Sequence, residues 1–571
     1  TPLCVRRSWP RLSGGGVLFT SYDFLFLFLP ACLLLSYLAA RIGGLTAGKI
    51  ALILMSLAFY AYWRVDHLWI ILTSIALNYA GIRLAERLAS QGLRNLGLAA
   101  LVSFNVILIG AFKYFNLILT TYTDVTGVAV DLAAVALPLG ISFFSFQQIA
   151  YIVDFHRGGR RDDNFIDYAL AVLFFPHLIA GPLVKYRSLI DQFNPARKRA
   201  QADIVTIGDA DVKAPAPPSQ RRTATAVRVV GERLFRPTAV GVAIGVTILA
   251  IGLFKKVFFA DNFAVYADPV FTAAEQGVGL AAVDAWIGAV SFFFQIYFDF
   301  SGYTDMAIGL ALLFGVSLPV NFLSPYMSRS IVEFWRRWHI TLSSFLRDYI
   351  YIALGGNRHG PALRYINLLL TMLIGGLWHG ASWTFVAWGG LHGLFLVINN
   401  VYNRIRGAVP LKSSLPERLF YQALTVFAVL ITWVYFRAET FGGAHRLFAD
   451  MFDFSDAAAT SMLTYEGMAS SLPGQFARAF IELDMSTFGM VTIWLALAGF
   501  AGLLVFCFPN TYELFSRYHE AESEVPNSLR TKPLFNVRWT LSPHWMLFAA
   551  LALAIGMLSM TQVAQFIYFE F

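Results

Sequence analysis

The sequence predicts an all-α polytopic membrane protein, with about eleven or twelve transmembrane helices and additional re-entrant segments. Of its 571 residues, 57% are hydrophobic and only 14% are charged, whereas soluble domains carry roughly 25% charged residues. Apolar runs of about 20 residues, the length of a helix that crosses a bilayer, recur along the whole chain. The three cysteines have neither disulfide nor zinc spacing, and we expect no metal site.

The first part of the chain supplies five predicted spans. The opening TPLCVRRSWPRLSGGG has no initiator Met, so we expect residues 1–16 to be a non-native or mis-started extension. Residues 17–571 then form a single membrane domain. Apolar runs place the first spans near 24–40, 48–63, 67–83, 95–118 and 133–155.

Basic residues set the predicted orientation. The connections 41–49, 83–94 and 156–165 are rich in Lys and Arg, whereas the alternate connections are acidic. Cytoplasmic loops carry the excess of Lys and Arg, so these three lie in the cytoplasm and the N-terminus lies outside. The net charge of +8 therefore indicates loop asymmetry, and we expect no nucleic-acid partner.

The piece 166–184 is expected to be re-entrant or broken, because it is short and contains Pro176 and Pro182. The stretch 185–237 is basic and Pro-rich, which predicts a cytoplasmic loop that is partly disordered. The loop 438–487 has more acids than bases and suits the outer face. Further spans are expected near 239–260, 283–314, 364–379, 383–402, 419–436, 488–508 and 543–560.

One predicted span carries a polar face. Gln295, Asp299 and Tyr303 follow one another at intervals of four residues, which places them on one side of a helix. A carboxylate at the centre of a membrane costs at least ~2.5 kcal/mol on insertion scales. Asp299 should therefore face a cavity or pair with an Arg of the following loop. Lys255 and Lys256 are interpreted as lysines that extend to the membrane interface.

Two histidines flanked by tryptophans stand 40 residues apart, in FWRRWHITLS and GGLWHGASW. His379 follows Gly375 and Gly376, which permit close approach of a backbone or ligand, while Trp378 and Trp383 supply flat apolar walls. An imidazole there is a ready general base, although a hydrogen-bonded core histidine has the same pattern. His339 is flanked by basic residues and is expected near the cytoplasmic face. His392 would lie on nearly the opposite side of a continuous helix from His379, so it ranks third among these three candidate catalytic histidines.

Several ordered motifs resemble those of the membrane-bound O-acyltransferases, within them the bacterial alginate O-acetyltransferase-like branch. The resemblance runs from about Leu18 to the C-terminus, except for an apparent insertion at 197–235. The motifs that carry it are LPLGISFFSFQQIAYIVDFHRG (137–158), FFPHLIAGPLVKY (174–186), GLFKKVFFADN (252–262), QIYFDFSGYTDMAIGLALLFG (295–315), FWRRWHITLSSFLRDYIYIALGGNR (334–358) and GGLWHGASWTFVAWGGLHG (375–393).

The resemblance implies a fold and a reaction. Family members form a ring of helices around a thinned centre with a funnel from each side, and move an acyl group from a cytoplasmic thioester to a hydroxyl. The family's two active-site histidines correspond to His339 and His379, and the second is the usual catalytic position. The supporting or substrate-binding residues that we expect from these motifs are Trp378, Trp383, Asp299, Tyr303, Arg336, Arg337 and Asn357.

The resemblance also implies partners and a location. We expect a protein of the bacterial inner membrane, in contact with lipid and without a bound cofactor, that uses acetyl-CoA or another acyl thioester as co-substrate. A separate periplasmic or membrane-anchored transferase would complete transfer to an exported polysaccharide or cell-wall polymer. Two alternatives stay open: a D-alanyl-transfer member that uses a carrier-protein thioester, and a transporter or flippase, which would show paired broken helices in two related halves.

Overall fold

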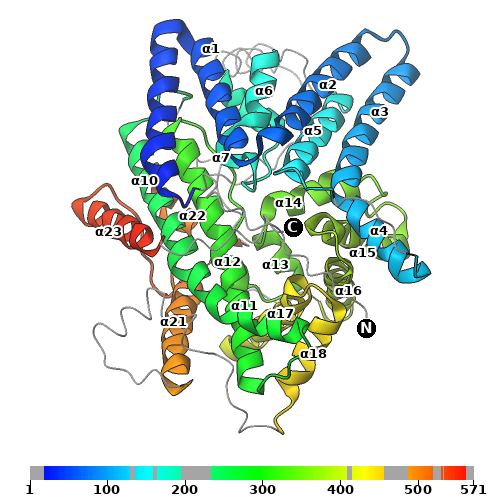
Figure 1. Cartoon of the computed structure of the whole chain (residues 1–571), viewed down its shortest axis with the longest axis vertical. Coiled ribbons are helices and arrows are strands. Elements are labelled where there is room, and N and C mark those ends of the chain that lie inside the picture. The colour runs from blue at the N-terminus through cyan, green and yellow to red at the C-terminus, as the bar shows by residue number, and fades with distance from the viewer. Residues whose placement is uncertain are drawn as a thin grey trace.

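The protein is built from helices, as the computed structural model shows (Figure 1). The structure describes residues 19–128, 135–158, 164–194, 233–407, 414–455, 487–518, 529–531 and 533–560. Within these ranges it contains no strand, only one isolated β-bridge between Arg233 and Arg236. The predicted all-α class is confirmed. The predicted extension 1–16, and most of the predicted loops 185–237 and 438–487, lie outside the described residues.

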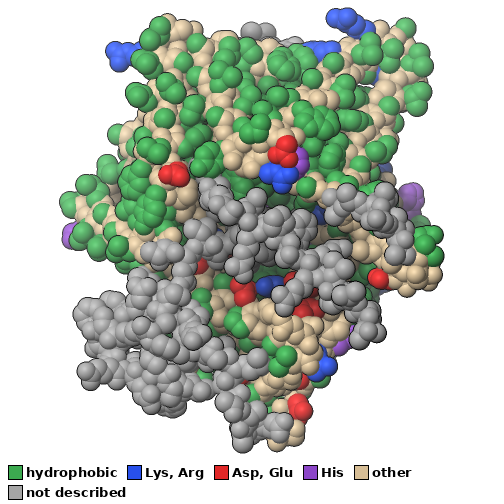
Figure 2. Space-filling view, in the orientation of Figure 1, with side chains coloured by type: hydrophobic (Ala, Val, Ile, Leu, Met, Phe, Trp, Pro, Cys, Tyr) green, Lys and Arg blue, Asp and Glu red, His purple; other side chains and the backbone are tan. Residues whose placement is uncertain are grey.

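The N-terminal helices present their apolar side chains outward. A π-helical turn, η1 (Phe24–Phe28), leads into α1 (Leu29–Arg64), which bends at Gly44, where φ is 77°. The following helices are η2 (Val65–His67), α2 (Leu68–Arg87), α3 (Gln91–Ile109), η3 (Gly110–Tyr114) and α4 (Phe115–Thr126). Large apolar residues on α1–α3 are exposed, and hydrophobic side chains cover the upper half of the face in Figure 2. Such a surface suits lipid.

The predicted interruption in 166–184 is present. α5 (Ile141–His156) is followed by α6 (Phe165–Leu173), which stops at Phe174, and by the single turn α7 (Phe175–Leu178) with Pro176 near its start. An extended stretch then leads to α8 (Tyr186–Phe193). Almost all of 166–184 is buried, so this irregular backbone is surrounded by protein and not by lipid, as membrane proteins require.

A long buried helix, α12 (Ala282–Leu313), runs through the centre of the molecule (Figure 1). It packs along α10 (Ala239–Phe254), η4 (Lys255–Ala260) and α11 (Asp261–Glu275). The backbones approach closely: a Cβ placed on Gly252 would lie 2.6 Å from the carbonyl oxygen of Gly302. Small residues at such crossings are typical of membrane helices.

The segment after α12 carries both candidate histidines. The chain passes η5 (Pro325–Met327) and then forms α13 (Ile331–Arg337), α14 (Ile340–Phe345) and η6 (Leu346–Tyr351). The hairpin of α15 (Gly360–His379) and α16 (Trp383–Arg406) follows, joined by residues 380–382. The remaining helices are α17 (Leu415–Arg437), α18 (Phe441–Phe452), α21 (Thr487–Cys507), α22 (Thr511–Leu514), η7 (Ser516–Tyr518) and α23 (Pro543–Ser559).

Six helical stretches of the described chain are long and apolar enough to cross a membrane. The first, Phe24–Arg87, has 64 residues and contains three of the spans predicted from sequence. α21 and α23 each include a shorter apolar helix. The chain is therefore a multi-pass α-helical membrane protein.

Candidate active site

His379 is the last residue of α15 and is buried at 4% exposure. The next residue, Gly380, is extended, so the imidazole sits where the chain leaves the helix. Three aromatic rings enclose it, with centroid distances of 4.9 Å to Trp378, 5.0 Å to Trp388 and 5.3 Å to Phe436. The histidine therefore lies in an aromatic cage that keeps bulk water away.

Close packing of α15 against α16 builds this cage. A side chain on Gly376 would collide with the carbonyl oxygen of Phe385, and one on Gly389 would collide with that of Met372. A side chain on Gly380 would collide with the Phe385 ring. These glycines are needed because the two helix backbones nearly touch, which brings Trp388 of α16 onto His379.

His339 lies in a strained turn between α13 and α14. Its backbone is left-handed (φ 41°, ψ 54°) and its side chain is fully buried. Segment 321–323 fixes the backbone before and after this turn: the Ile340 N–H donates to Asn321 O at 3.1 Å, and the Leu323 N–H donates to Arg337 O at 3.0 Å. Left-handed non-glycine residues cost of order 1–3 kcal/mol and gather at functional sites.

The structure brings the two histidines together. Their ring centroids are 6.4 Å apart, although the residues are 40 positions apart in sequence. Trp378 contacts both rings, at 6.1 Å from His339, and Phe146 stacks on it at 5.4 Å. Phe300 of α12 meets His339 edge-on at 4.7 Å. The predicted pair is thus one buried site.

The wall expected from Trp383 is formed by other residues. Trp383 is 53% exposed and its indole N–H donates to Thr121, because it occupies the first turn of α16, which faces outward. Trp388 and Phe436 take its place against His379. Sequence reasoning missed Trp388, although the glycine pair that follows it in AWGGLHG marks a close helix contact.

His392 has a structural role. The Trp335 indole can only donate, so Nδ1 of His392 accepts its N–H at 3.2 Å. The Thr432 hydroxyl donates to Val429 O and lies 2.9 Å from Nε2, so Nε2–H donates to it. Both ring nitrogens are occupied, and His392 ties α13, α16 and α17 together. Its predicted separation from His379 assumed a continuous helix, which residues 380–382 interrupt.

Asp299 is paired with a lysine and not with an arginine of the following loop. Lys256 Nζ lies 2.8 Å from Asp299 and 2.6 Å from Asp261. Lys256 is 3% exposed, so the interpretation of this residue as an interfacial lysine is wrong. A carboxylate in the interior attracts a cation from the facing helix because both are costly to bury alone. Asp299 thereby joins α12 to η4.

The other expected supporting residues lie in three different settings. Tyr303 is buried and stacks on Phe19 at 4.9 Å. Arg337 is buried, with Glu333 at 2.8 Å and Leu323 O at 2.9 Å as acceptors, so it supports the His339 turn. Arg336 is exposed. Asn357 lies in the exposed turn after η6 and accepts the Tyr351 hydroxyl at 2.5 Å.

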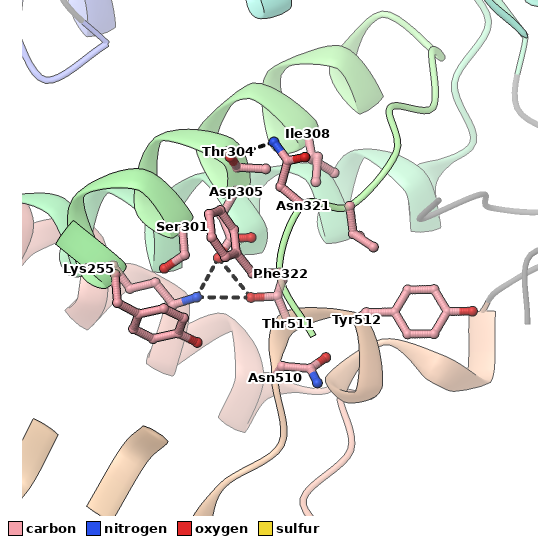
Figure 3. A pocket seen from close by; sticks show the side chains of 12 residues that line it. Lys255, Ser301, Thr304, Asp305, Ile308, Asn321, Phe322, Asn510, Thr511 and Tyr512 are labelled. Carbon is pink, nitrogen blue, oxygen red and sulfur yellow. Dashed lines mark hydrogen bonds and ion pairs between the residues drawn. The ribbon is translucent and has the colours of Figure 1, made fainter. Parts of the chain in front are cut away.

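A second polar cluster joins η4, α12 and α22 (Figure 3). Lys255 Nζ is 2.7 Å from Asp305, and the Thr511 hydroxyl donates to the same carboxylate at 2.8 Å. Lys255 thus pairs internally, contrary to its interpretation as an interfacial residue. Asn321 lines the same recess and also accepts the Thr341 hydroxyl at 2.6 Å, which links the recess to the turn after His339.

The site suits proton transfer in a dry environment. Imidazole is the side chain most used as a general base, and aromatic walls exclude the water that would compete for an activated acyl group. Among the described residues, no group of three or more His, Cys, Asp or Glu side chains is placed to hold a metal ion.

Comparison with known proteins shows family relatives over most of the chain. Residues 55–438 match the model of the MBOAT, membrane-bound O-acyltransferase family. The probable alginate O-acetylase AlgI of Azotobacter vinelandii is 40% identical over 77% of this chain and 79% of its own length. The peptidoglycan O-acetyltransferase of Helicobacter pylori is 36% identical over 76% of this chain and 80% of its own.

A more distant relative is the teichoic acid D-alanyltransferase of Streptococcus thermophilus, 26% identical over 52% of this chain and 66% of its own length. The region that matches the family model, residues 55–438, contains α2 to α17 with both buried histidines. The chain belongs to the membrane-bound O-acyltransferase family and is an O-acyltransferase.

Proposed function

We propose that this enzyme takes an acetyl group from acetyl-CoA in the cytoplasm and passes it across the bacterial inner membrane towards hydroxyls of an exported polysaccharide or cell-wall polymer. The observation that carries the proposal is the pair of buried histidines, 6.4 Å apart, in a chain that is 40% identical to an alginate O-acetylase relative.

His379 is proposed as the general base. An imidazole nitrogen takes the proton of an acceptor hydroxyl while the hydroxyl oxygen attacks the thioester carbonyl. The C–O bond forms and the C–S bond breaks, and the thiolate leaves and takes up a proton as CoA thiol. His339 orients the donor or assists this proton transfer, because its ring lies 6.4 Å from that of His379 and, like it, beside Trp378.

A basic cluster on the η6 side supports a donor that carries phosphates. Lys185 Nζ pairs with Asp348 at 2.8 Å, Arg347 with Asp348 at 2.6 Å, and Arg157 donates to Asp348 O at 3.2 Å. Burial opposes ionisation of Asp348, but hydrogen bonds from Arg347 and Lys185 outweigh it and hold its pKa below the usual value. Arg157 binds the backbone carbonyl of Asp348, and Asp154 interacts with the same charges. Three cations beside two carboxylates still leave a net positive surface, to which phosphates are attracted.

We further propose that a periplasmic or membrane-anchored transferase receives the acetyl group. The relatives are named for acetyl transfer to alginate and peptidoglycan, which are polymers, whereas His339 and His379 are buried at 0% and 4% exposure, out of direct reach of a polymer. A second candidate function is transfer of D-alanyl from a carrier-protein thioester, and the observation that favours it is the likeness to a teichoic acid D-alanyltransferase.

Donor specificity tests the proposal. We would purify the enzyme in detergent, add an oligosaccharide with free hydroxyls as acceptor, and follow thiol release from acetyl-CoA and, in parallel, from a D-alanyl carrier protein. Release from acetyl-CoA that His379→Ala abolishes, and that Asp299→Asn reduces only through lost folded protein, is the expected result. Release from the carrier protein alone would favour the second candidate. A folded enzyme that releases thiol from neither would contradict both.

A further inference from the structure

Lys113 is a buried lysine that packs against the C-terminal end of α15, the helix that carries His379. It lies in η3, at 6% exposure. Its ammonium group donates to the carbonyl oxygen of Trp378 and, at 3.1 Å, to that of His379 itself. The neighbouring residue, Tyr114, donates its hydroxyl to Leu377 O at 2.8 Å. Two consecutive side chains of η3 therefore bind three consecutive carbonyls of α15.

These three carbonyls need partners. The last four C=O groups of an α-helix accept no hydrogen bond from within the helix. After α15 the chain continues through Gly380 in an extended conformation. Because His379 belongs to this last turn, its ring can be no better fixed than the turn itself. The partial negative charge at a helix C-terminus also favours a cation there, and the Lys113 ammonium supplies it.

The other buried lysines differ in their partners. Lys49 and Lys256 each lie 2.6 Å from a carboxylate. Lys113 instead donates to two backbone carbonyls and lies over the face of the Trp378 ring at 5.9 Å. An ionisable side chain within a membrane segment indicates function, and here the hydrogen bonds and the cation–π contact of Lys113 are made to His379 and to the adjacent Trp378.

We propose that Lys113 is a positioning residue for catalysis: it caps α15 from outside and fixes His379 in the orientation that transfers the proton. Tyr114 contributes in the same way through a single hydrogen bond. The acceleration that Lys113 provides rests on the proposed function, whereas its control of where His379 lies does not.

The expected kinetic result is a loss of kcat alone. Lys113→Met keeps the length of the side chain but removes its donors, and a catalytic group misplaced by about 1 Å loses on the order of 100-fold in rate. KM for acetyl-CoA should stay unchanged. Lys113→Arg, which keeps a cation with several donors, should restore part of kcat, and Tyr114→Phe should lose less than Lys113→Met.

A matched control separates positioning from loss of stability. The double variant Lys49→Met/Asp167→Asn removes another buried lysine together with its partner in α6, far along the chain from α15. Per folded molecule its kcat should equal that of the wild type. A wild-type kcat in folded Lys113→Met would overturn the catalytic part of the proposal, and a wild-type kcat in Tyr114→Phe would do so if Lys113→Met does not fold.

A second measurement is independent of turnover. Diethyl pyrocarbonate modifies histidines, and peptide mass spectrometry reports each site separately. In Lys113→Met or Tyr114→Phe, modification of His379 should accelerate severalfold, while His392, fixed by Trp335 and Thr432, should keep its wild-type rate. Equal rates at His379 in variant and wild type would overturn the proposal, as would acceleration at both histidines, which indicates general loosening. This result stands even if the donor is not acetyl-CoA.

Discussion

At the scale of single residues, the two histidines of the proposed active site are held by backbone and not only by side-chain contacts. His339 sits at a left-handed position whose flanking backbone is fixed by segment 321–323, and His379 sits at a helix end. Both positions aim a ring at one place that regular helix geometry would not reach. The buried packing around the turn holds His339 in this unfavourable backbone conformation.

The Lys256 cluster allows a prediction about stability. Lys256→Met removes the cation beside the buried Asp299 and the partly buried Asp261, and breaking a buried pair in this way costs about 3–5 kcal/mol. Asp299→Asn leaves Lys256 paired with Asp261 at 2.6 Å and should cost clearly less. Thermal unfolding of both variants in the same detergent checks this order. If Asp299→Asn unfolds at the lower temperature, the cluster does not hold α12 to η4 as described.

At the scale of helices, the α15–α16 hairpin forms the site. Its sequence, rich in Gly and Trp, allowed the two apolar runs and the His379 position to be predicted. The sequence alone could not tell that Gly376 faces Gly389 or that Trp388, not Trp383, meets His379. Which face of a helix packs inward depends on where it starts, and the cap at Ser382 sets that start.

The hairpin contact makes a second prediction. Gly376→Ala places a methyl group against the Phe385 carbonyl and must push the helices apart, so both thermal stability and thiol release should fall. Overpacking of this kind typically costs about 1–3 kcal/mol. Gly390→Ala is the matched control, because the nearest atom to a Cβ there is Leu373 Cδ2 at an ordinary 3.4 Å. The contact is wrongly assigned if the two variants behave alike.

The lysines of η4 show the limit of sequence reasoning at this scale. Hydropathy located the helix of 239–260 but suggested that Lys255 and Lys256 extend to the interface. Instead, the π-helical turn η4 directs both towards carboxylates of α12. A lysine near a helix end has the same sequence pattern in either case, and only the facing helix decides between lipid interface and buried ion pair.

For the whole molecule, the positive-inside pattern predicts sidedness. The α2–α3 connection and α18 lie at opposite ends of the molecule (Figure 1), and Ala89 and Asp453 are exposed there. In a background without native cysteines, Ala89→Cys should react with an impermeant thiol reagent only after the inner membrane is opened. Asp453→Cys should react in spheroplasts with an intact membrane. The opposite pattern would invert the proposed donor and acceptor sides.

The central claim is that His379 is the general base, and its neighbour in the aromatic cluster provides the most direct test. His379→Gln and His392→Gln change the same side chain on two residues that both contact Trp388, at 5.0 Å and 4.9 Å. With the oligosaccharide acceptor present, single-turnover thiol release from acetyl-CoA should fall about 10²–10⁴-fold in His379→Gln. In His392→Gln it should stay near the wild-type rate, since the amide can replace both hydrogen bonds. A wild-type rate in folded His379→Gln would contradict the account.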